Sequence, residues 1–247
     1  MNRRTYLGAV AGSTFLAGAG GSPFGDRVVG RDGSDGGRLA ERQTNGTGTT
    51  SASTPGTETT GAASFGPRTF SGRGTSTTGE FELSPGPIVA EFFHDGESNF
   101  ISELLTVEGE SYEDVALTNL IGTVEGAQVR SVSAPGAHVL NVDADGEWEI
   151  TLTQSASPEV RSLPQTASGT GPSVVAPIGF EGLTRAEGTH EGASNFIVEA
   201  VPLDPEAFGS LVFNEIGEFD GATTARIPRP SYLNVAADGE WSLSLSA

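Results

Sequence analysis

The sequence predicts an all-β protein with two tandem antiparallel β-sandwiches of jelly-roll-like form, which follow a disordered stalk. Three observations lead to this prediction. Short segments of alternating apolar and polar residues recur between Gly, Pro, Asp and Asn, which is the pattern of strands and turns. No stretch of about a dozen residues keeps a convincing helical period. The third observation is an internal duplication, in which the same motifs return in the same order.

The duplication consists of three ordered blocks. They are residues 94–101 and 190–197, 119–122 and 214–217, and 140–148 and 233–241. Three blocks in one order indicate a duplicated module. Each copy has roughly 85 residues, which is enough for one small domain. We therefore expect sandwich repeats at 68–155 and 166–247, joined by a polar linker at 156–165 that contains Pro158 and Pro164.

Residues 1–25 are expected to be a signal peptide. Arg3 and Arg4 precede an apolar stretch of about 14 residues rich in Gly and Ala, the order of a signal peptide. The adjacent arginines resemble the twin-arginine signal, which implies export to the cell surface or the extracellular space. The stretch is shorter than the roughly 20 residues that a membrane-spanning helix needs. We expect no transmembrane segment in the mature chain.

A Ser/Thr/Gly-rich tract at 26–67 is expected to form a disordered linker. Residues 44–61 are almost entirely Thr, Ser and Gly, and such a composition buries too little apolar surface to offset its ordering entropy. The high density of hydroxyls suits O-glycosylation, and the triplet that starts at Asn45 matches the N-glycosylation pattern.

The charge of the chain is strongly acidic and unevenly distributed. Thirty-two acidic residues face 13 basic ones, all of which are arginine. Residues 1–69 carry seven arginines against five acids, whereas residues 70–247 carry six against 27. This lysine-free, acidic composition resembles that of proteins from halophilic archaea, in which concentrated salt screens the self-repulsion. It argues against nucleic acid or an anionic membrane as partner.

No cofactor or metal site is predicted. The chain has no cysteine, which excludes disulfides, thiolate metal sites and a cysteine nucleophile. Asp143 and Asp145 have part of the spacing of a calcium loop, but that spacing is incomplete, and the second copy has Ala236 in place of Asp143.

The last two strands of each copy are predicted to form a hairpin. In the second copy a three-residue loop, 237–239, would place Val235 opposite Trp241 and Leu233 opposite Leu243, so that the apolar faces match. Gly239 would supply the positive φ that this loop needs. The first copy follows the same rule around Gly146, and the indole of each copy would cap the core.

One polar cluster is repeated and is the candidate ligand-binding corner. It consists of His94, Ser98, Asn99, His190, Ser194 and Asn195. A turn at Gly96 or Gly192 would lead into a strand that begins at the asparagine, with Phe100 or Phe196 pointing inward. Two interpretations stay open: a ligand site at the rim of the sandwich, or side chains that satisfy the backbone of the turn. No catalytic residue is assigned, because no nucleophile elbow or oriented acid accompanies the serine.

The repeat resembles small modules of exported bacterial and archaeal proteins that share His-x-Gly-x-Ser-Asn-Phe and Ala-Asp-Gly-x-Trp. This resemblance implies an exported β-sandwich without an assigned activity.

The first hypothesis is a non-enzymatic binding or adhesion module for an envelope glycan or a surface protein. The alternatives are a secreted hydrolase that uses the histidine corner, and a structural spacer. A binding module should expose aromatic side chains, and the candidates are Tyr112, Phe208, Phe213 and Phe219. The oligomeric state is not predicted.

Overall fold

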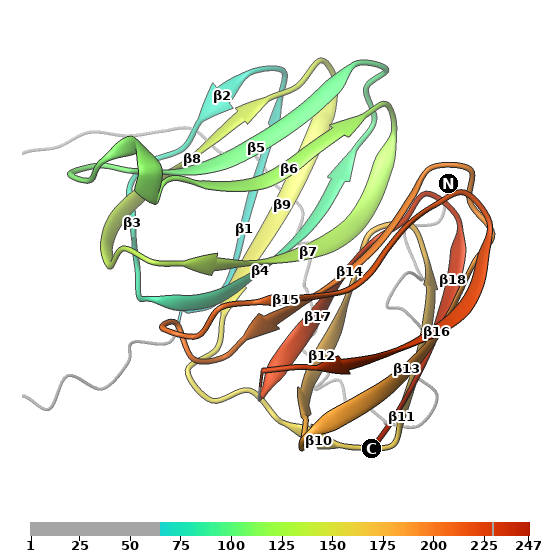
Figure 1. Cartoon of the computed structure of the whole chain (residues 1–247). Helices are drawn as coiled ribbons and strands as arrows, with labels where there is room; N and C mark the ends of the chain where they lie inside the picture. The colour runs from blue at the N-terminus through green and yellow to red at the C-terminus, as the bar shows by residue number, and fades with distance from the viewer. Residues whose placement is uncertain (1–64, 229) are drawn as a thin grey trace, which may run out of the picture. The chain divides into compact units, whose positions relative to one another are not determined.

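The computed structural model describes residues 65–228 and 230–247 and confirms the predicted all-β fold. Its strands form two β-sandwiches (Figure 1). The predicted signal peptide and nearly all of the predicted stalk lie outside the described residues. Among the described residues, no helix is long and apolar enough to cross a membrane.

The first sandwich contains two antiparallel sheets. One has the order β1-β9-β4-β7, and the other has the order β2-β8-β5-β6, with β3 also paired to β8. The strands are β1 (Phe65–Arg73), β2 (Ser76–Thr77), β3 (Phe81–Leu83), β4 (Gly86–His94), β5 (Asn99–Thr106), β6 (Val115–Ile121), β7 (Val124–Val132), β8 (Gly136–Asp143) and β9 (Glu147–Gln154). A short 3-10 turn, η1 (Ser111–Glu113), lies in the loop between β5 and β6.

The second sandwich repeats this arrangement. Its sheets have the orders β11-β18-β13-β16 and β10-β12-β17-β14-β15 (Figure 1). The strands are β10 (Arg161–Ser162), β11 (Gln165–Thr170), β12 (Ser173–Gly179), β13 (Leu183–His190), β14 (Asn195–Pro202), β15 (Ser210–Ile216), β16 (Phe219–Arg226), β17 (Ser231–Ala236) and β18 (Glu240–Ser246). The segment 156–165 is not purely a linker, because β10 pairs in parallel with β12 and β11 begins at Gln165.

The core of each sandwich is formed by the inward side chains of alternating strand residues. Phe100 and Phe196 are fully buried, as the pattern predicted. Trp148 and Trp241 are also buried, and each indole N–H donates to a backbone carbonyl, that of Gly74 or Gly171. The prediction that the tryptophans cap the cores is confirmed.

The predicted terminal hairpins are wrong. β17 pairs with β12 and β14, whereas β18 pairs with β11 and β13, so the turn between them crosses from one sheet to the other. β8 and β9 are divided between the two sheets of the first sandwich in the same way. Gly146 and Gly239 are not among the glycines with positive φ. The apolar faces still match, because both sheets of a sandwich direct alternate side chains into one core.

Two backbone N–H groups of the edge strand β7 in the first sandwich find acceptors in the second sandwich, within one compact unit. The Ala127 N–H donates to the Pro172 carbonyl at 3.0 Å, and the Val129 N–H donates to the Asn234 side-chain oxygen at 3.0 Å. Unpaired edge groups of a sheet are templates for unwanted strand pairing. These two hydrogen bonds therefore protect part of the β7 edge.

Candidate functional site

The histidine of the predicted corner lies inside the first sandwich. His94 is the last residue of β4 and has no exposed surface. Its ring stacks on Phe100 with centroids 4.8 Å apart. Nδ1 lies 2.9 Å from the carbonyl oxygen of Gly122, and Nε2 lies 3.3 Å from a carboxylate oxygen of Asp145. Because a carbonyl oxygen only accepts, Nδ1 carries a proton.

Asp145 fixes the turn that follows the histidine. Its carboxylate accepts the backbone N–H groups of Glu97 and Ser98 at 3.1–3.2 Å. The hydrogen bond from Glu97 is the main cause that lowers the pKa of Asp145, and the bond from Ser98 and the nearby His94 act in the same direction. A lowered carboxyl pKa contributes stability above the pKa of the unfolded chain, and this stability is lost as the pH falls through the folded value. The aspartate is thus a clamp that works best when ionised.

The glycines of the corner are required by close approach. A Cβ on Gly96 would collide with the Asp145 carboxylate and with the His94 ring. A Cβ on Gly146 would collide with the backbone nitrogen of Gly96 and with Asp95. The two turns, one before β5 and one before β9, therefore pack backbone against backbone. This packing explains why His-x-Gly and Asp-Gly occur together in each copy.

The second sandwich repeats these contacts at equivalent residues. His190 Nδ1 lies 2.8 Å from the Gly217 carbonyl oxygen, and Nε2 lies 3.2 Å from Asp238. Asp238 accepts the N–H groups of Ala193 and Ser194. The repeated motif is accordingly a structural clamp that joins three turns in each sandwich.

This geometry separates the residues of the predicted ligand corner. The rings of His94 and His190 are buried, whereas Ser98, Asn99 and their counterparts Ser194 and Asn195 are exposed. A catalytic base needs a ring nitrogen that can reach substrate. In His94, Nδ1 faces the Gly122 carbonyl oxygen, and Nε2 faces the Asp145 carboxylate and lies close to Gly96. Among the described residues, no group of three or more His, Asp or Glu side chains could hold a metal ion.

A different surface carries exposed apolar side chains in both sandwiches. Nine large apolar side chains of the described residues are exposed, and six of them lie on the β5–β6 hairpin or the β14–β15 hairpin. We call these two segments the apolar hairpins. Their exposed side chains are Val107, Tyr112 and Ile121 in the first sandwich, and Phe208, Leu211 and Ile216 in the second.

Two of the four aromatic candidates are exposed on the apolar hairpins. Tyr112 is 82 % exposed and Phe208 is 92 % exposed, each in the loop that precedes an edge strand. Phe213 is buried and Phe219 packs partly against the core. Ile121 and Ile216 follow the repeated asparagines Asn119 and Asn214 at equivalent positions. The sequence repeat could have revealed these two isoleucines, because both copies keep an isoleucine at a position that the core does not need.

No model of a known protein family matches the chain, and no curated protein matches it. The fold and its surfaces define a tandem β-sandwich protein with a buried histidine clamp and an apolar hairpin in each unit.

Proposed function

We propose that this chain is a non-enzymatic binding protein of the cell surface or extracellular space, in which each sandwich presents its apolar hairpin to a partner. The observation that carries the proposal is the position of Tyr112 and Phe208 on the matching loops of the two sandwiches, both almost fully exposed. Aromatic side chains contribute a large contact area at a low cost in conformational entropy, and they often dominate binding energies.

The charge of the chain supports this role for the hairpins. Residues 70–247 carry 27 acids against six arginines, so most of the surface repels other acidic molecules. Apolar side chains concentrated on two hairpins offer contacts that do not depend on charge. Two equivalent sites would also allow both sandwiches to engage one repetitive surface, which raises the overall affinity without a new contact. An envelope glycan or a surface protein fits this requirement.

The two alternatives explain less of the molecule. A hydrolase that uses the histidine corner would need the ring of His94 or His190 to reach a substrate, and both rings are buried. A structural spacer accounts for two tandem domains but gives no reason for apolar side chains at equivalent exposed positions. The clustering of those side chains favours a binding protein.

The test is the retention of the purified chain on isolated cell envelopes in molar salt. The native chain is expected to sediment with the envelopes, and the double variant Tyr112→Ser/Phe208→Ser is expected to bind at least about tenfold more weakly, which corresponds to the loss of a hot-spot contact. The matched control is Val160→Ser/Leu183→Ser, which removes two exposed apolar side chains outside the hairpins. Equal retention of both variants, or no retention of the native chain, would contradict the proposal.

A further inference from the structure

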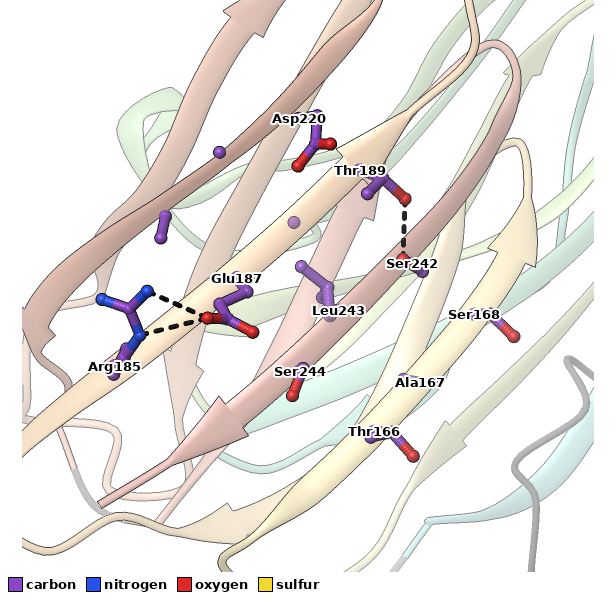
Figure 2. A pocket seen from close by; sticks show the side chains of 13 residues that line it. Thr166, Ala167, Ser168, Arg185, Glu187, Thr189, Asp220, Ser242, Leu243 and Ser244 are labelled. Carbon is purple, nitrogen blue, oxygen red and sulfur yellow. Dashed lines mark hydrogen bonds and ion pairs between the residues drawn. The ribbon is translucent and has the colours of Figure 1, made fainter.

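The second sandwich has a hollow on the outer face of its β11-β18-β13-β16 sheet (Figure 2). Its volume of about 670 Å³ lies within the usual range of ligand sites. Residues from all four strands line it, and most of their side chains are hydroxyl-bearing or charged. This face is opposite in the sandwich to the sheet that contains the β14–β15 hairpin, so the hollow is separate from the apolar hairpins.

The hollow exists because the side chains at its centre are short. Thr189 of β13 lies directly across from Ser242 of β18, and their hydroxyls are hydrogen-bonded at 2.7 Å. Figure 2 shows this pair between the strands that border the hollow. The equivalent pair in the first sandwich is Phe93 and Glu149, whose long side chains occupy the same part of the sheet. The two copies thus differ where the hollow lies.

The side chains around the hollow offer hydrogen-bonding groups to a ligand. Within the described residues, the hydroxyls of Thr166, Ser168 and Ser244 make no hydrogen bond to protein groups. Arg185 forms an ion pair with Glu187 at 2.9 Å, and its guanidinium lies at the border of the hollow (Figure 2). Hydroxyls accept and donate, and a guanidinium donates in a fixed plane. A ligand with many hydroxyls matches this set.

The charge of the hollow disfavours an anionic ligand. The charged groups that line it are Arg185, Glu187 and Asp220, with a net charge of one negative unit. The equivalent positions of the first sandwich carry Glu91, Glu125 and Glu149 and no arginine, which is a more repulsive environment. A polyanion would meet both Asp220 and the acidic surface around it. A neutral polyol meets no such repulsion.

We propose that the hollow binds a neutral oligosaccharide, with the hydroxyls of β11, β13 and β18 and the guanidinium of Arg185 as hydrogen-bonding partners. The proposal adds a ligand class to the proposed binding function but uses a separate surface. The hollow and the apolar hairpins can therefore be tested, and can fail, independently.

The experiment is calorimetric titration of the whole chain in molar salt with soluble neutral glucans, mannans and galactans, and with a polyuronate for comparison. We expect binding to at least one neutral polymer and none to the polyuronate. The variant Thr189→Phe/Ser242→Glu, which places the residues of the first copy in the hollow, is expected to weaken binding at least tenfold. Both positions are on the sheet surface, so thermal unfolding should show an intact fold.

The reciprocal variant, Phe93→Thr/Glu149→Ser, is the matched control, because it shortens the same pair in the first sandwich. It should bind the polymer at least as tightly as the native chain. The proposal is overturned if no neutral polymer binds at millimolar repeating unit, if the polyuronate binds equally well, or if Thr189→Phe/Ser242→Glu leaves the affinity unchanged. The hairpin variant Tyr112→Ser/Phe208→Ser should leave this affinity unaltered.

Discussion

At the scale of single residues, the histidine clamp shows how one motif can suggest a binding site and yet serve the fold. His94 ends β4 and Asp145 lies in the turn before β9, far apart in the sequence, and the carboxylate and the ring both contact Gly96. Burying the polar His94 ring is costly unless it finds a partner, and the Gly122 carbonyl oxygen accepts from its Nδ1. The Asp145 carboxylate stays exposed and accepts the backbone N–H groups of the turn.

The clamp predicts a steric requirement at Gly96. Gly96→Ala is expected to destabilise the chain by about 1–3 kcal/mol, because the new methyl group forces the Asp145 carboxylate and the His94 ring apart. The matched control is Gly79→Ala, since a Cβ at Gly79 meets no atom within 4 Å and its φ is not positive. That variant should change the stability by no more than about 0.5 kcal/mol. Chemical denaturation in molar salt measures both, and equal effects would contradict the clamp.

The sequence was sufficient to predict the turn at Gly96 and the inward direction of Phe100, but not the burial of the histidine. A serine, an asparagine and a histidine in one short segment have the same pattern whether they face solvent or clamp a turn. The deciding partners, Asp145 and the Gly122 carbonyl, lie in other turns. Only the three-dimensional arrangement of those turns distinguishes the two interpretations.

At the scale of elements, the two sandwiches fill the same part of the core with a phenylalanine that comes from different sheets. The first sandwich has Phe92 on β4 and Thr118 on β6, and the second has Gly188 on β13 and Phe213 on β15 at the corresponding positions. Phe92 lies 5.9 Å from Phe100, measured between ring centroids. Phe213 lies 5.7 Å from Phe196, the counterpart of Phe100. The ring reaches the same part of the core from either sheet.

This exchange predicts strong coupling within the second core. Gly188→Phe is expected to cost about 1–3 kcal/mol through overpacking, because a Cβ there already lies 3.1 Å from the Phe213 ring. Phe213→Thr is expected to cost about 3–5 kcal/mol through the cavity it leaves. Combining both substitutions with Val198→Ser should recover much of the loss. The new serine would supply a hydroxyl partner for the new threonine, as Ser102 does for Thr118 in the first sandwich. Denaturation midpoints of the single and triple variants test this, and additive losses would refute it.

The error in the terminal hairpins belongs to this scale as well. Alternation with a period of two identifies which side chains face the core, but both sheets of a sandwich face the same core. A turn that joins two strands of one sheet and a turn that crosses between sheets therefore bury the same residues, such as Val235 and Trp241. The pattern predicts a positive φ at Gly239, whereas the structure requires glycine there because a Cβ would collide with the Gly192 backbone. A local sequence pattern therefore shows neither the sheet to which a strand belongs nor the reason for the glycine.

At the scale of the whole molecule, the acidic charge predicts that the fold needs salt. Residues 70–247 contain 27 acids and six arginines, so the sandwiches repel themselves electrostatically. Raising the salt from 0.1 M to 1 M shortens the screening length from about 10 Å to about 3 Å. Repulsion between neighbouring strands is then largely removed. The cores of small sandwiches provide a limited free energy of unfolding. Relief of this repulsion is therefore a sizeable fraction of that free energy.

The melting temperature is accordingly expected to rise by roughly 5–10 °C between 0.1 M and 1 M KCl, as thermal scans by circular dichroism would show. The variant Glu91→Gln/Glu125→Gln/Glu149→Gln separates charge screening from other effects of salt. It removes three carboxylates from neighbouring strands, and Glu125 and Glu149 are both paired with Phe93. Its melting temperature should be higher at 0.1 M and depend less on KCl than that of the native chain. An unchanged salt dependence would mean that KCl acts through hydration of the apolar core rather than through screening, because only the screened repulsion depends on these carboxylates.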